Sequence, residues 1–167
     1  HAMHSDDTNA APMFPALTGE QRKAVKDFLA LADALGTSLS ADDVKEFKVQ
    51  AAKTHVATPS LLAAFDGTNA WQALLKPVEK VGHLSAAENL KDARKAFHPF
   101  SEAAVALAQA LRRADKEFAS VKVFRCPMTK DAFPGAPNRA DWLQLKPEIH
   151  NPWFGQEMPD CGAEVKP

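Results

Sequence analysis

Both cysteines of the chain lie in its C-terminal third, and each has a methionine close by in the sequence. Met128 follows Cys126 by two residues, and Met158 precedes Cys161 by three. Thiolate and thioether sulfurs are soft ligands that select Cu(I) and related ions. Because both segments read as irregular, the two side chains of each segment can turn toward one ion. The four residues therefore form a candidate soft-metal site.

Histidines extend this candidate ligand set, because imidazole also binds Cu(II) and zinc. His98 precedes Pro99 inside a long predicted helix, so its ring is expected at a bend that faces the C-terminal loops. A histidine packed in a core would have the same sequence context, and both interpretations of His98 stay open. His150 is an additional candidate ligand, although a place on the surface explains it as well. His55 and His83 are expected at helix ends, where solvent or carbonyl groups account for them.

The cysteines can instead form a disulfide, which is the usual fate of a cysteine pair in a secreted domain. A Cys126–Cys161 disulfide and a metal site both require the two sulfurs to lie close together. A structural zinc site is less favoured, because it usually takes four Cys or His ligands at paired short spacings and the chain has no C-x-x-C. Spacing alone leaves metal and disulfide as open alternatives.

Composition and motifs argue against several other classes of function. The 20 basic and 21 acidic residues give no excess of positive charge with which to attract nucleic acid. No apolar run approaches the roughly 18 to 20 residues that span a bilayer, so we expect no membrane insertion. G-x-S-x-G, H-E-x-x-H, P-loop and dinucleotide-binding motifs do not occur, and we therefore expect that the protein is not an enzyme.

Apolar residues at three- and four-residue spacing predict the helices that must position the candidate site. The first helix begins with a capping box at Thr18 and Gln21 and is expected to stop at Gly36. The second is expected to begin at Ser40 and to end at Pro59.

Two further helices follow the same spacing. The third covers 71–81, and the fourth begins at a second capping box, formed by Ser85 and Glu88. The fourth helix reaches about Leu111, is expected to be the longest and contains Pro99, which should bend it. Four such helices predict an antiparallel four-helix bundle.

The pattern changes after residue 120. Val121, Val123 and Phe124 favour a strand, and 142–145 predicts a second short strand, whereas the prolines of 147–159 preclude a regular helix. The predicted fold class is therefore mainly α: an antiparallel four-helix bundle with a C-terminal irregular region or small β-ribbon.

We expect one domain overall, with three parts along the chain. Residues 1–17 are interpreted as an expression remnant followed by a disordered tail, and residues 18–120 as the helical bundle. Residues 121–167 are the loop region that carries the cysteines and methionines and packs on the bundle.

The chain from about Thr18 to Pro167 resembles an uncharacterised bacterial domain family, most specifically in its C-terminal third. This family occurs as secreted single-domain proteins and as the C-terminal domain of periplasmic adaptor subunits of copper/silver-type heavy-metal efflux pumps. Its helical part matches only in pattern. The resemblance rests on these motifs: Phe97-His98-Pro99-Phe100-Ser101, Val123-Phe124-Arg125-Cys126-Pro127-Met128, Asp141-Trp142-Leu143, Asn151-Pro152-Trp153-Phe154-Gly155, Met158 and Cys161-Gly162.

The resemblance implies a periplasmic or otherwise extracytoplasmic domain that binds and hands over copper, as Cu(I) or Cu(II), with silver or zinc as other ions. It implies that Cys126, Met128, Met158 and Cys161 are the ligands, and it favours metal over disulfide. The expected partners are the metal ion and either efflux-pump subunits or a periplasmic metal chaperone. His98 matches only part of the family, and position 150 is commonly arginine there.

Two other functions stay open at this stage. Thiolates with His and Met donors also build copper electron-transfer sites, mononuclear or dinuclear. A structural docking domain with a Cys126–Cys161 disulfide is the second alternative.

Overall fold

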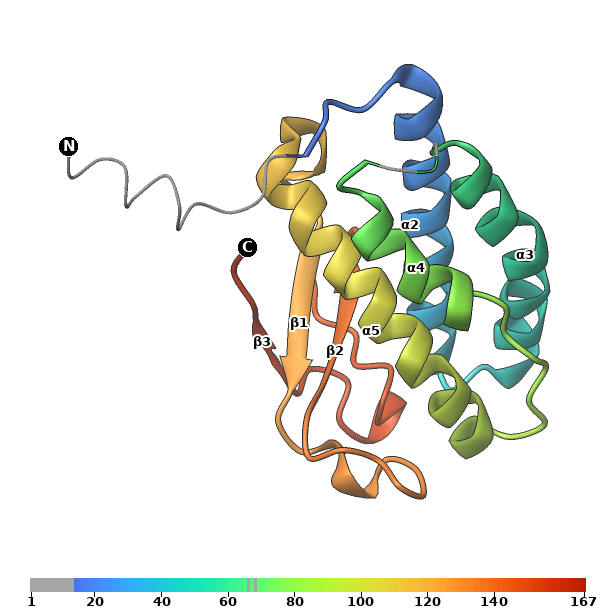
Figure 1. Ribbon diagram of the computed structural model, residues 1–167. Coiled ribbons are helices and arrows are strands. Elements are labelled where there is room, and N and C mark those ends of the chain that lie inside the picture. The colour runs from blue at the N-terminus through green and yellow to red at the C-terminus, as the bar shows by residue number, and fades with distance from the viewer. Residues whose placement is uncertain (1–13, 66, 68) are drawn as a thin grey trace.

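Helices and short strands form two layers in the computed structural model, which describes residues 14–65, 67 and 69–167 (Figure 1). Residues 1–13 of the predicted disordered tail lie outside the described residues. Leu17, the last residue assigned to that tail, is buried in the core.

Helix α2, Gly19–Ser40, begins at the predicted capping box, in which the backbone N–H of Gln21 donates to the Thr18 side chain. The predicted stop at Gly36 was wrong. Gly36 is buried, and a Cβ at this position would lie 3.7 Å from the ring of Phe97. That is an ordinary contact distance, and the helix continues because Leu35 and Leu39, on either side of the glycine, are both fully buried.

Helix α3, Val44–Ala63, begins later and ends later than the sequence predicted. Its N-cap is Asp43, whose side chain accepts from the N–H of Glu46. Pro59 lies inside the helix instead of ending it. The helix continues because Leu61, beyond the proline, is fully buried and extends the apolar face of the helix.

Helix α4, Gln72–Val81, agrees with the predicted third helix. Helix α5, Leu90–Ala114, is the longest described element at 25 residues, which confirms that prediction, and it contains Pro99. The predicted capping box at Ser85 was wrong, because Asn89 is the N-cap and its side chain accepts from the N–H of Asp92.

Three strands form an antiparallel sheet in the order β2-β1-β3. Strand β1 is Lys122–Cys126, β2 is Ala140–Gln144 and β3 is Ala163–Glu164. The mainly α fold class that the sequence predicted was wrong, since the protein combines the helices with this sheet. Strand β3 lies in the C-terminal region for which the sequence predicted irregular structure or a small β-ribbon, and two residues are too few to show alternation in a sequence.

The sheet is a layer of the core and not an appended ribbon. Strands β1 and β2 both contact α5, and β2 also contacts α2, whereas α3 lies on the far side of the helical layer (Figure 1). Val123, Trp142 and Leu143 of the sheet are buried in the same cluster as Phe97 and Phe100 of α5. Within the described part of the chain, no helix has the length and apolar character needed to cross a membrane.

Candidate metal centre

The two cysteine sulfurs lie 3.9 Å apart, and both thiols are free. A disulfide would require about 2.05 Å. Two sulfurs bonded to one metal at about 2.3 Å, with an angle between tetrahedral and trigonal, lie about 3.8 to 4.0 Å apart. The observed separation is that of a hydrogen bond between the two thiols, and it is also the distance that two ligands of a shared ion would have.

Strand pairing brings the two cysteines together although they are far apart in the sequence. Cys126 is the last residue of β1, and Cys161 lies two residues before β3, which pairs with β1 through Arg125 and Ala163. Gly162, between Cys161 and β3, has φ +147, and a Cβ there would lie 3.1 Å from the carbonyl oxygen of Arg125. A glycine at this position lets the tail approach β1 closely.

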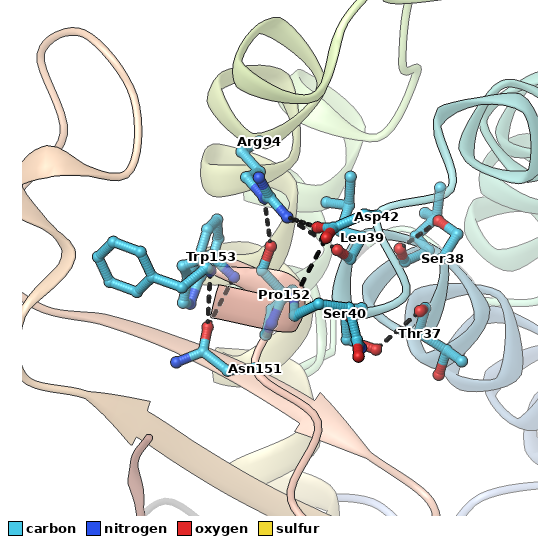
Figure 2. A network of polar contacts seen from close by, with 12 residues as sticks. Thr37, Ser38, Leu39, Ser40, Asp42, Arg94, Asn151, Pro152 and Trp153 are labelled. Atoms are coloured by element: carbon cyan, nitrogen blue, oxygen red, sulfur yellow. Dashed lines mark hydrogen bonds and ion pairs between the residues drawn. The ribbon is translucent and has the colours of Figure 1, made fainter. Parts of the chain in front are cut away.

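Asn151 holds the segment that carries Cys161, and it is fully buried. Its amide group donates to the carbonyl of Cys161 at 2.7 Å, and its backbone N–H donates to the carbonyl of Pro159 at 2.8 Å. Its side-chain oxygen accepts from the N–H groups of Trp153 and Phe154 (Figure 2). Asn151 therefore uses its side chain and its backbone to fix the Cys161 turn.

Arg94 of α5 anchors the same loop to the helices (Figure 2). Its guanidinium donates to the carbonyls of Pro152 at 2.7 Å and Leu39 at 2.9 Å, and it forms an ion pair with Asp42 at 2.8 Å. Gly155, with φ +58, lies so close that a Cβ would overlap the Asp42 carboxylate. The loop is thus tied to the end of α2 and to α5.

Sequence reasoning missed the positioning roles of Asn151 and Arg94. An arginine on a helix face is ordinarily solvated, so only the structure shows that Arg94 is buried. Asn151 carried a local signal, since an asparagine side chain often accepts from backbone N–H groups two or three residues later. The contact from Asn151 to Cys161 depends on the folded loop.

The two methionines differ in how far the fold prepares them for a metal. Met158 is partly buried and is the first residue of a turn that ends at Cys161. The N–H of Cys161 closes this turn by donating to the carbonyl of Met158 at 3.3 Å. Met128 follows β1 and is 57% exposed. A methionine side chain has three rotatable bonds, so Met128 can reach different positions at low cost. Met158 thus belongs to the turn that contains Cys161, whereas the Met128 side chain is exposed to solvent.

His98 packs between aromatic rings. Its ring centroid lies 5.7 Å from that of Trp153 and 5.9 Å from that of Phe133, and its Nδ1 lies 3.7 Å from the Glu102 carboxylate. It also lines a cavity of about 280 Å³ with Arg125, the residue before Cys126. Among the described residues, no hydrogen bond or ring contact joins His98 to either cysteine. The structure therefore places His98 beside the end of β1 but in its own aromatic pocket.

His150 belongs to a different polar cluster. Its backbone N–H donates to the Gln144 side chain at 2.8 Å, and its exposed side chain lines a cavity with Asp33 of α2. Burial raises the pKa of the Asp33 carboxyl, an effect opposed by the hydrogen bond from the Leu145 N–H and by the charges of Lys146 and His150. The structure thus places His150 with α2 and not with the cysteines.

The protonation of the thiols also bears on whether a metal fits. Burial raises the pKa of Cys161, and the neighbouring Cys126 and the carboxylate of Asp160 raise it further. Two thiolates this close would repel each other without a cation between them. A bound metal ion would supply that positive charge, so the pair is suited to bind a cation as the protons leave.

The side chains close to the cysteine pair can be compared with the ligand set of a structural zinc site. Within the residues that the structure describes, no three His, Cys, Asp or Glu side chains lie close enough to hold one ion. A structural zinc site would require four such ligands. Met158 and Met128 are the methionines nearest to the cysteines in the sequence, and their thioethers are donors that suit Cu(I) and Ag(I).

No known protein-family model matches the chain, and no curated protein or solved structure matches it. The resemblance to the efflux-associated family therefore stays a prediction. The geometry of the cysteine pair and of the groups that position it is the feature of this chain that bears on its function.

Proposed function

We propose that this chain is an extracytoplasmic binding domain for a soft metal ion, Cu(I) or Ag(I). The thiolates of Cys126 and Cys161 bind the ion, and the thioether of Met158 is the third ligand. The observation that carries the proposal is the 3.9 Å separation of the two sulfurs, which suits a bridging metal. The ordered turn around Cys161, fixed by Asn151, supports it because it presets the position of one ligand.

The differing accessibility of the ligands supports a role in metal handover. Cys126 is fully buried, Cys161 is partly buried and Met128 is exposed. An incoming soft ligand from a partner can therefore replace the outer ligands first while Cys126 still holds the ion. The expected partner is a protein with its own cysteine or methionine ligands, such as an efflux-pump subunit or a metal chaperone.

The test is an anaerobic competition titration of the reduced protein against a chromogenic Cu(I) chelator. The parent should take one Cu(I) from the chelator, and the double variant Cys126→Ser, Cys161→Ser should take none. Met158→Leu should weaken binding more than Met128→Leu, which is the matched control because it removes a thioether from the exposed side. Equal Cu(I) affinity in the parent and the double-serine variant would refute the proposal.

Oxidation provides a second test, because a disulfide and a bound metal exclude each other. Cu(I) is bound by the two thiolates, and oxidation to a disulfide removes both thiolates. Thiol titration of the metal-free, reduced protein should therefore find two reactive groups, and Cu(I) should protect both. A protein that is purified without reductant, has no titratable thiol and resists mild reduction would instead be a disulfide-bonded docking domain.

A further inference from the structure

A second pair of metal-binding side chains lies on the helical layer. Nδ1 of His55, in α3, lies 2.9 Å from Nδ1 of His83, just after α4. The two rings are stacked with centroids 5.1 Å apart and an interplanar angle of 29°, and both residues are exposed. The sequence had suggested only separate roles at helix ends for these histidines.

Buried hydrogen bonds fix the backbone on both sides of His83. Thr58 donates to the carbonyl of Gly82 at 2.6 Å, and the N–H of Leu84 donates to Thr54 at 3.0 Å. Both threonines are fully buried. Residues 82 to 84 are thus held against α3 by contacts that do not involve the imidazoles. The two rings therefore meet because the fold places them together, and a ligand need not order the segment.

The distance between the two nitrogens suggests which ion the pair suits. Imidazole nitrogens bind a metal at about 2.0 to 2.1 Å, so two of them at a right angle lie about 2.8 to 3.0 Å apart. Two nitrogens at a tetrahedral angle would lie about 3.3 to 3.4 Å apart. The observed 2.9 Å is the length of an N–H···N hydrogen bond, and it also lets the two nitrogens take adjacent positions of a tetragonal ion with little movement, the geometry that Cu(II) and Ni(II) prefer.

We propose that His55 and His83 form a chelating site for a tetragonal divalent ion, with Cu(II) as the ion that binds most tightly. Without metal, one imidazole donates a hydrogen bond to the other. With metal, both Nδ1 atoms are deprotonated and bind the ion, and water completes its coordination. The site is separate from the cysteine pair because α3 lies on the opposite side of the helical layer from the sheet (Figure 1).

The test uses the full chain with Cys126→Ser and Cys161→Ser as the parent background, so that thiols neither bind nor reduce the Cu(II) probe. Cu(II) is titrated calorimetrically and followed by electron paramagnetic resonance. The test variant adds His55→Asn and His83→Asn. The matched control instead adds His98→Asn and His150→Asn, so it removes the same number of histidines. His1 and His4 are present in all three proteins and contribute equally.

The parent and the matched control should each bind one more Cu(II) than the test variant, with nitrogen hyperfine structure from two imidazoles. The single variant His83→Asn should lower the affinity about 100-fold, because it removes the chelate. Circular dichroism should show the same helicity in all variants, since Thr54 and Thr58, and not the imidazoles, hold residues 82 to 84 against α3. Equal Cu(II) stoichiometry and affinity in the parent and His83→Asn would overturn the proposal, whatever the Cu(I) titration shows for the cysteines.

Discussion

The chemistry of the cysteine pair depends on how strongly its surroundings disfavour a free thiolate. Burial is the largest cause of the raised pKa of Cys161, and the neighbouring Cys126 adds to it through its charge and its hydrogen bond. The thiolate is the form that binds metals and reacts with alkylating agents. The Cys161 thiol of the metal-free protein should therefore be largely protonated and slow to react near neutral pH.

This environment predicts how fast Cys161 is alkylated by iodoacetamide in the reduced, metal-free protein. A raised pKa lowers the thiolate fraction at a given pH, so Cys161 should react more slowly than an ordinary thiol near neutral pH, and its rate should still be increasing with pH above about 8.5, where that of an ordinary thiol levels off. Cys126→Ser removes one cause of the shift but leaves burial, so the pH profile should move down in pH without becoming normal. Rates measured by mass spectrometry from pH 7 to 10 check this. A Cys161 that reacts like a free cysteine in both proteins would contradict it.

Asn151 gives the second prediction at the level of single residues. Asn151→Ala removes the acceptor for Trp153 and Phe154 and the donor for the Cys161 carbonyl. Buried groups without partners cost about 1 to 3 kcal/mol each, so we expect a loss of at least about 3 kcal/mol in the free energy of unfolding. Cu(I) affinity should decrease by about 10- to 100-fold, as for other residues that orient a ligand.

Denaturant unfolding and the Cu(I) competition titration measure these two effects. The matched control is Asn138→Ala, because Asn138 is exposed and, among the described residues, its backbone carbonyl accepts from the N–H of Thr129 while its side chain forms no hydrogen bond. That variant should change stability by no more than about 0.5 kcal/mol. Similar losses in the two variants would mean that the Asn151 side chain has no special role.

Among the elements, those with local signals were predicted best. The start of α2 was correct because Thr18 and Gln21 cap it through bonds within one turn. Gly36 and Pro59 misled the prediction because burial in the folded core outweighs the local tendency to end a helix. Strand β3 has no local signal, since pairing with β1 alone defines it.

The residues of the candidate site also divide into those that the sequence could predict and those that it could not. The sulfur residues could be found from the sequence because soft-ligand chemistry belongs to the residue type, and the structure places Cys126 and Cys161 together. The hydrogen bonds of Asn151 and the burial of Arg94 could not be found, because each joins segments that only the fold brings close. His55 and His83 were missed for the same reason.

The short connection from Cys161 to β3 gives a prediction at the level of elements. Gly162→Ala places a Cβ 3.0 Å from the Trp142 ring and 3.1 Å from the Arg125 carbonyl, at a φ of +147 that alanine rarely adopts. The tail should then move away from β1 and separate the two sulfurs. We expect a loss of about 2 to 4 kcal/mol in stability and at least about tenfold weaker Cu(I) binding.

Gly135→Ala is the matched control for this variant. Gly135 also has a positive φ, +80, but a Cβ there would meet no atom within 4 Å. Gly135→Ala should lower the free energy of unfolding by the backbone strain alone, about 1 to 2 kcal/mol, and should leave Cu(I) affinity unchanged. Thermal unfolding and the competition titration separate the effect of backbone strain, which both variants share, from that of the steric clash, which only Gly162→Ala introduces. If the two alanine variants bind Cu(I) equally well, close approach at Gly162 does not control the site.

For the whole molecule, the question is whether the metal builds the fold or binds to a fold that exists without it. The core joins all the described helices to the sheet through residues such as Phe28, Leu75, Phe100 and Trp142, none of which is a proposed ligand. Arg94 ties the ligand loop to α2 and α5 without any metal. The scaffold therefore has its own sources of stability.

We expect the reduced, metal-free protein to keep nearly all of its helicity, as measured by far-ultraviolet circular dichroism after chelation. Cu(I) should then raise the thermal midpoint, because an ion that binds only the folded state stabilises it by about 2.7 kcal/mol when its free concentration is 100 times the dissociation constant. The Cys126→Ser, Cys161→Ser variant should be folded but show no such increase. Arg94→Met should lower the midpoint of both metal-free proteins equally, because its bonds anchor the loop whether or not the thiols are present. A largely unfolded spectrum for the metal-free parent would instead mean that metal binding and folding are one event.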